Sequence, residues 1–211
     1  MKDVAYSRSA LRTLRRIPRN EAERIRSKIE QYAANPAAQA NNVKKLQGRE
    51  GYRLRVGDWR VIFDENHVVI DVLAIGPRGG VYDQEPGMIK PDIITTPGGE
   101  RMAVIPLAHY RRLVADSETA HDLNAYDAAK ARLASGADEI VPAAFARRLL
   151  DGENPVAVYR GLRGLTARAL AAKVGVSAPY LSQIEAGKRE GSIAVMKALA
   201  EALGVGIEDL V

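Results

Sequence analysis

The sequence predicts an α+β protein in three parts: two helices on a curled antiparallel sheet, a small β-hairpin with helices, and an all-helical end. Two patterns predict the sheet, because apolar residues alternate over 52–63 and run almost continuously over 68–75. A third pattern predicts the helical end, because residues 155–211 show helical apolar spacing with repeated caps. We therefore expect a domain over 1–85, a linker over 86–91, a middle segment over 92–152 and a helical domain over 153–211.

The composition of the 211-residue chain excludes several classes of chemistry. Because the chain has no cysteine, it can form neither a disulfide nor a thiolate metal site, and it cannot use a catalytic thiol. Its three histidines are scattered, so we expect no metal site and no cofactor. No apolar run approaches the ~20 residues of a membrane span, and no signal-peptide pattern is present. These features predict a cytoplasmic protein.

The net charge of +5 is distributed unevenly along the chain. Residues 1–87 hold 16 basic and 11 acidic side chains, residues 88–154 hold 8 and 10, and residues 155–211 hold 7 and 5. Basic ends are typical of proteins that bind nucleic acid, and an acidic middle can contact a basic end. Scatter in small counts explains the same numbers nearly as well.

The first part begins with a possible short strand over residues 2–6, followed by two helices. Ser7 or Ser9 can cap the first helix, which Pro18 stops. Asn20 and Glu23 have the spacing of a capping box for the second helix, which Asn35 and Pro36 end. The apolar faces of the two helices are Ala10, Leu11, Leu14 and Ile17, and then Ala22, Ile25, Ile29 and Tyr32.

A β-hairpin over residues 52–63 gathers arginines on one face. Gly57 and Asp58 suit a two-residue type II′ turn, so Arg55 should lie directly opposite Arg60. Opposed like charges on a sheet cost stability, and a bound anion such as a phosphate would explain their presence. The alternative is that these are ordinary solvated arginines on a one-sided sheet.

The middle part shows less specific patterns. A hairpin is predicted over residues 92–106, then a helix over 107–114, a second helix over about 117–133 and a short third helix over 142–150. The apolar residues of these helices could contact another part of the chain or form an internal core, and the two interpretations have equal weight. These residues are Leu123, Tyr126, Leu133, Phe145 and Leu149.

The last part has the pattern of a helix-turn-helix. One helix starts at Thr166 and breaks at Gly175, and the next starts from the cap Ser177 with Pro179 in its first turn. In proteins with this motif the second helix lies in the major groove of DNA. Ser192 can cap a further helix with an apolar face.

Residues 155–211 resemble the Xre/Cro-type helix-turn-helix family, most clearly in the string Leu181-Ser-Gln-Ile-Glu-Ala-Gly-Lys-Arg189. The resemblance implies that the second helix reads bases and that Lys188 and Arg189 hold phosphate. The implied base-reading residues are Ser177, Ala178, Pro179, Ser182 and Gln183. Members often carry a glutamine that contacts the DNA backbone where this chain has Ala167, so either the affinity for DNA is lower or Arg168 takes over the contact.

Residues 1–82 resemble the RelE/ParE toxin superfamily, through two helices, a curled sheet and the Lys-Leu-x-Gly element before the hairpin. RelE-type members cut messenger RNA on the ribosome, and ParE-type members poison gyrase. The positions of the RelE-type site correspond here to Arg53, Arg55, Arg60, Arg78 and Tyr82, and this match favours RelE over ParE. Lys44 and Lys45 are expected to bind RNA beside that site.

Residues 88–150 resemble antitoxin segments that bind toxins or dimerise, and residues 97–113 resemble the start of the Phd/YefM antitoxins. Together the resemblances imply a type II toxin–antitoxin system in one chain. We expect a ribosome-dependent mRNA endoribonuclease that the antitoxin part of the same chain, or of a two-fold partner, holds inactive. We also expect a homodimer that binds operator DNA and represses its own gene.

Three alternatives remain from the sequence. The first domain could inhibit gyrase, it could be an inactive toxin attached to a repressor, or two natural chains could have been joined artificially. The absence of a Gly/Ser-rich linker argues mildly against artificial joining.

Overall fold

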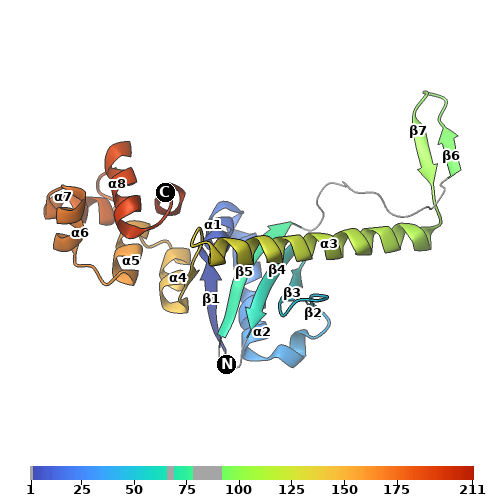
Figure 1. Ribbon diagram of the computed structural model, residues 1–211, viewed down its shortest axis with the longest axis horizontal. Coiled ribbons are helices and arrows are strands. Elements are labelled where there is room, and N and C mark those ends of the chain that lie inside the picture. The colour runs from blue at the N-terminus through green and yellow to red at the C-terminus, as the bar shows by residue number, and fades with distance from the viewer. Residues whose placement is uncertain (1, 66–68, 78–91) are drawn as a thin grey trace.

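The computed structural model describes residues 2–65, 69–77 and 92–211. Its order is a sheet domain, a projecting hairpin, one long helix and a helical domain (Figure 1). The strands are β1 (Asp3–Ser7), β2 (Val43–Lys45), β3 (Tyr52–Val56), β4 (Trp59–Glu65), β5 (Val69–Pro77), β6 (Asp92–Thr95), β7 (Arg101–Val104) and β8 (Ile140–Val141). The helices are α1 (Arg8–Arg16), α2 (Arg19–Ala34), the 3-10 turn η1 (Pro36–Gln39), α3 (Leu107–Ala134), α4 (Ala143–Leu150), α5 (Pro155–Leu162), α6 (Ala167–Val174), α7 (Ala178–Glu185), α8 (Ile193–Leu203) and α9 (Ile207–Leu210).

The main sheet has the strand order β2-β3-β4-β5-β1-β8. It is mixed rather than wholly antiparallel, because β1 pairs in parallel with β5. The outermost strand β8 comes from the middle segment and pairs antiparallel with β1. The middle segment is therefore part of the sheet of the first domain.

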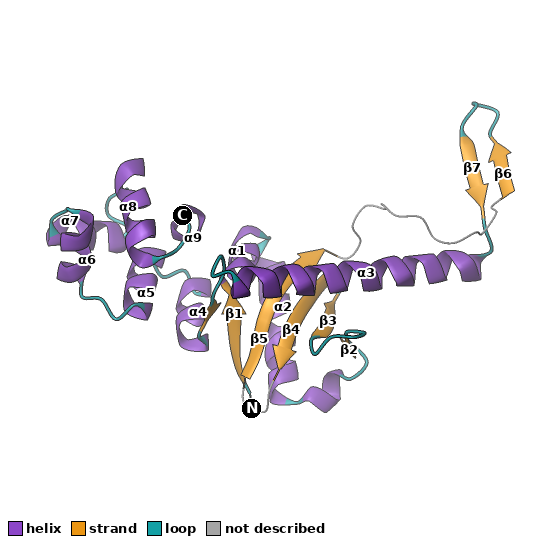
Figure 2. Cartoon of the chain, viewed as in Figure 1, coloured by secondary structure: helices purple, strands orange, loops and turns teal. Residues whose placement is uncertain are grey.

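The two faces of this sheet carry different layers. Helices α1 and α2 pack on one face through apolar side chains that include Leu11, Ile25 and Phe63. Helix α3 crosses the other face, where Tyr126 and Ala129 pack with Ile62 (Figure 2). The first core continues through α4 into the helical domain, where Tyr159 and Leu199 belong to the same buried cluster.

The boundaries of the elements agree with several sequence expectations. Ser7 caps α1 by accepting the Ala10 N–H at 3.1 Å, and α1 ends before Pro18. In the helical domain, Thr166 and Ser177 cap α6 and α7, and Gly175 ends α6 in the left-handed conformation with φ 74°. These features were predicted because the capping side chains and breakers act locally.

Two expectations about helices were wrong. The expected capping box of Asn20 and Glu23 is absent, because α2 already begins at Arg19 with Pro18 at its N-cap and no capping side chain. The two helices expected over 107–114 and 117–133 are one helix, α3, of 28 residues. The polar run between them continues the helix because it contains no glycine or proline.

Hairpin β6–β7 stands at the far end of α3, away from the sheet (Figure 1). All eight of its strand residues are exposed. A two-stranded hairpin without a covered face is only marginally stable in water. No helix of the described ranges is long and apolar enough to cross a membrane.

Candidate functional sites

The arginine hairpin forms as the sequence predicts. Gly57 has φ 61° in the turn between β3 and β4, and Arg55 lies opposite Arg60 in the strand register. Arg53 and Arg60 are nevertheless buried, with 6% and 2% of their surface exposed. The alternative interpretation, that the hairpin arginines are solvated, is therefore wrong for these two residues, and their charges need partners within the protein.

Helix α3 supplies these partners. Glu118 lies 2.6 Å from Nη2 of Arg55 and 3.0 Å from Nη2 of Arg60. Asp122 forms an ion pair with Arg53 and lies 3.4 Å from Nη1 of Arg60. Because residues four apart on a helix lie on one face, the two carboxylates meet the three guanidinium groups together. We call these five residues the closed arginine cluster.

The apolar residues of α3 continue the contact along the same helix face. Tyr126 and Ala129 are buried and pack with Leu46, Ile62 and Leu73 of the sheet domain. A side-chain carbon at Gly51 would overlap the ring of Tyr126, so this close approach requires glycine there. Of the two interpretations of the apolar residues, contact with another part of the chain therefore holds for Tyr126, which packs on the sheet domain.

Glu118 and Asp122 are site residues that were not predicted. Their signal was the series of α3 positions 118, 122, 126 and 129, two acidic and two apolar, at helical spacing. The series lies within the helix expected over 117–133, but helical spacing alone does not identify the surface against which a helix face packs.

Further along α3, the helix contributes both a cation and an anion to the contact with the sheet domain. Lys130 donates to Asp64 at 2.9 Å, and Asp64 lies opposite Asp71 on the neighbouring strand. Burial, followed by the nearby charge of Asp64, raises the pKa of Asp71. On the exposed rim, Arg49 lies 2.7 Å from Asp127 and its hydrogen bond lowers the pKa of that carboxyl. Along its length, α3 therefore places charged side chains opposite side chains of the other sign on the sheet domain.

We expect the Asp71→Asn variant to be more stable than the parent chain at neutral pH. A carboxyl whose pKa is raised by folding binds protons more tightly when folded, so its ionised form opposes folding above that pKa. The gain should be below about 1 kcal/mol because Asp71 is only partly buried, and it should vanish below the ordinary carboxyl pKa of about 4. Urea unfolding between pH 3 and 8 measures it, and a gain that does not depend on pH would contradict the explanation.

The remaining predicted residues of the first site lie in two places. Lys44 and Lys45 are exposed on β2, and Lys44 pairs with Arg53 in the register, so Lys44 borders the closed arginine cluster. Arg78 and Tyr82 lie outside the described residues. What the described part shows is an anion-binding cluster whose anions are two carboxylates of the same chain.

The predicted DNA-binding residues gather on α6, α7 and the turn after α7. Those with exposed side chains are Arg168, Ser177, Pro179, Ser182, Gln183, Lys188 and Arg189. The hydroxyl of Ser177 also caps α7, and Ala178 is partly buried against the core, so Ala178 presents less surface to DNA than we expected. The Arg189 guanidinium lies 4.8 Å from the centre of the Tyr180 ring, which holds a cation beside the recognition helix.

Comparisons with known proteins agree with this division. Residues 4–82 match the family model described as the ParE toxin of the type II toxin–antitoxin system parDE. Residues 156–210 match a helix-turn-helix family model. A crystal structure of the restriction-modification controller protein C.AhdI from Aeromonas hydrophila is 27% identical over 28% of this chain and 89% of that chain, with a TM-score of 0.27. No curated protein matches the chain.

The fold and these matches define the class of protein: a toxin domain of the RelE/ParE type followed by a DNA-binding domain of the Xre type. The presence of both matches in one polypeptide supports a type II toxin–antitoxin fusion. The matched toxin model is that of ParE, so the preference for RelE over ParE rests on the arginine positions alone.

Proposed function

We propose that the first domain is a RelE-like, ribosome-dependent mRNA endoribonuclease that helix α3 of the same chain holds inactive. The observation that carries this proposal is the closed arginine cluster, in which Glu118 and Asp122 occupy three guanidinium groups. Arginine forks bind carboxylate and phosphate with the same geometry, so the carboxylates would exclude an RNA phosphate by taking its place. On this proposal inhibition acts within one chain, and no two-fold partner is needed for it.

The chemistry follows from the groups that the cluster provides. The ribose 2′-hydroxyl attacks the adjacent phosphorus, the bond to the 5′-oxygen breaks, and a 2′,3′-cyclic phosphate remains. Arg53, Arg55 and Arg60 would align the phosphate and neutralise the charge of the pentavalent intermediate. Lys44 would bind the RNA beside them, and Tyr82 would stack on a base.

Proton transfer is the slow part of this mechanism. Arginine keeps its proton up to a pH of about 12, so Arg55 is a poor general base in place of a lysine. We therefore expect catalysis by orientation and charge, with ribosomal RNA contributing to the step.

The match to the ParE family model favours a second candidate, in which the same domain inhibits gyrase. The closed arginine cluster would then block a protein-binding surface. Both functions can be tested with a full chain in which Glu118 and Asp122 are replaced by arginine, so that α3 no longer lies on the arginines. A gyrase supercoiling assay and an mRNA cleavage assay on translating ribosomes, run with this opened variant, separate the two. Inhibited supercoiling with intact mRNA would favour the ParE-like function over the ribonuclease.

For the second domain we propose binding to operator DNA and repression of the gene that encodes the chain. The exposed face of α7 would read bases, and Lys188 and Arg189 would hold phosphate. Repressors with this motif bind as dimers to half-sites about 34 Å apart. We therefore include a homodimer in the proposal.

The β6–β7 hairpin supports dimerisation. The register places Ile94 opposite Met102, with Val104 on the same face, and these three side chains are 47–49% exposed. The hairpin contains two acidic and one basic side chain among residues 92–104, so a second copy would meet little repulsion. Both strand edges are also open in the described chain, as they must be for pairing with another hairpin.

We expect Ile94→Asp to convert the dimer to a monomer, because it places a charge in an apolar contact. Thr95→Asp, on the opposite face of the same strand, should leave the dimer intact. Sedimentation velocity over a concentration series measures both. A wild-type chain that is monomeric at all concentrations would contradict the homodimer. Equal effects of both variants would show that the Ile94 face of the hairpin is not the dimer interface.

A further inference from the structure

The edge of the sheet at β1 is covered by residues 137–141, which attach there by backbone pairing. Val141 lies opposite Tyr6 and Ile140 opposite Ser7 in the register. The Arg8 N–H donates to the Glu139 carbonyl at 3.1 Å, which extends the pairing by one residue. Val141 has no exposed surface, so the strand is anchored by apolar burial as well.

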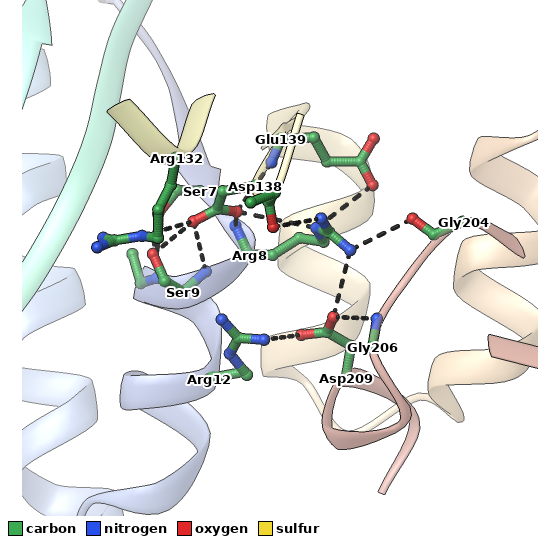
Figure 3. A network of polar contacts seen from close by, with 12 residues as sticks. Ser7, Arg8, Ser9, Arg12, Arg132, Asp138, Glu139, Gly204, Gly206 and Asp209 are labelled. Carbon is green, nitrogen blue, oxygen red and sulfur yellow. Dashed lines mark hydrogen bonds and ion pairs between the residues drawn. The ribbon is translucent and has the colours of Figure 1, made fainter. Parts of the chain in front are cut away.

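The Asp138 carboxylate is bound where β1 turns into α1. It accepts the backbone N–H of Arg8 at 2.9 Å and the Ser9 hydroxyl at 2.6 Å (Figure 3). It also accepts the Ser9 N–H at 3.3 Å. A carboxylate at a helix N-terminus is favoured by the partial positive charge of the helix. Asp138 is only 4% exposed, so little of this contact is screened by water.

The Arg8 guanidinium joins three parts of the chain at the same place. Its Nη2 donates to the Ala137 carbonyl at 3.0 Å, and its Nη1 lies 3.4 Å from Asp209 of α9 (Figure 3). Its Nε lies 3.8 Å from both Asp138 and Glu139. Because Arg8 is 7% exposed, the loss of these acceptors would leave a buried cation without compensation.

This attachment is separate from the closed arginine cluster. It uses β1 and the start of α1, whereas the cluster uses β3 and β4, and β5 lies between them in the sheet. Residues 137–141 lie beyond the end of α3, and the α3 residue that reaches this place is Arg132, 3.9 Å from Asp138, rather than Glu118 or Asp122.

We propose that the β1 edge together with Arg8 and Ser9 is a recognition site for an acidic strand with the pattern Asp-Glu-Ile-Val, and that this site retains the neutralising segment on the toxin domain. Helix α3 blocks the arginines, and this site keeps the helix in place. It is strand addition to a sheet edge, with backbone pairing for affinity and an acidic side chain for specificity. That this segment neutralises a toxin rests on the proposed function, whereas its docking at the sheet edge does not.

The test uses the full chain and compares Asp138→Asn with Asp151→Asn. Asp151 is a matched control, because it lies in the same segment and its side chain is exposed, pairing among the described residues only with Arg26 at 3.3 Å. Hydrogen exchange of the amides of β8 and of Arg8 should be at least about tenfold faster in Asp138→Asn, since a hydrogen bond to a charged group contributes about 1.5–3 kcal/mol. Asp151→Asn should exchange like the parent chain.

A labelled peptide of residues 135–150 tests whether the site recognises the segment in trans. The chain's own segment occupies the site in the parent chain and is loosened in Asp138→Asn. The peptide should therefore bind Asp138→Asn at least about tenfold more tightly than the parent chain. A peptide with asparagine at position 138 should not bind. If Asp138→Asn does not fold, Arg8→Lys, which keeps the charge but loses the fork, takes its place in the exchange measurement, where the amides of β8 should again exchange faster than in the parent chain.

Unchanged exchange in the variant, or a peptide that binds equally with either residue at position 138, would overturn the proposal. Neither measurement depends on RNA cleavage or on gyrase. The recognition site can therefore fail while the proposed function stands, and the reverse is also possible.

Discussion

Replacing both Glu118 and Asp122 by arginine should turn a silent full-length chain into one that cleaves mRNA on translating ribosomes. The substitutions place two cations against Arg53, Arg55 and Arg60, so α3 can no longer lie on the cluster. Breaking a buried ion pair costs about 3–5 kcal/mol, which corresponds to a change of about 10²–10³ or more in the ratio of open to closed chains. We expect the initial rate of cleavage, measured by primer extension, to rise by at least about 100-fold.

Two controls make this result specific. Asp116→Arg replaces one acidic residue of the same helix by arginine, but its side chain is 72% exposed and, among the described residues, pairs only with Arg112, so the chain should stay silent. Arg60→Ala in the opened chain should remove cleavage again, because Arg60 contacts both carboxylates and would contact the substrate in their place.

Other results would contradict the proposed function in different ways. Equal cleavage by the parent and opened chains would rule out neutralisation by α3. No cleavage by the opened chain, with faster hydrogen exchange in α3 as proof of opening, would rule out the ribonuclease. The gyrase inhibitor and the repressor with an inactive toxin domain would then remain, and supercoiling and growth assays separate these two.

The parts of the molecule that the sequence predicted depend on local signals. The turn at Gly57 fixes the register that puts Arg55 opposite Arg60, and Ser177 and Gly175 fix the ends of the recognition helix and the turn before it. In each of these places one or two residues determine the backbone, so the pattern can be read without knowledge of the rest of the fold.

The parts that the sequence did not predict depend on contacts between distant segments. The ion pairs of Asp122 with Arg53 and of Asp138 with Arg8 join residues 69 and 130 positions apart. The addition of β8 to the sheet likewise joins it to β1, near the start of the chain. A two-residue strand also gives no periodic signal of its own. Charge patterns suggested that an acidic middle would meet a basic end, but they could not identify which carboxylate meets which arginine.

Charge reversal beside the recognition helix should strongly weaken binding to operator DNA. Lys188→Glu replaces an exposed cation next to α7 with an anion, which loses a phosphate contact and adds repulsion from the same phosphate. We expect affinity to fall by at least about tenfold at 0.1 M salt, and the slope of log affinity against log salt to fall by about one unit.

Lys197→Glu is the matched control, because it makes the same change of charge at an exposed position of α8, away from the predicted DNA-reading residues. Electrophoretic mobility shift or fluorescence polarisation with DNA from upstream of the gene measures both variants over a salt series. If net charge alone drives binding, the two variants will weaken it equally and by the same salt slope. If α7 lies in the major groove, only Lys188→Glu will have the large effect, because only its side chain is held within reach of the phosphates that flank the recognition helix.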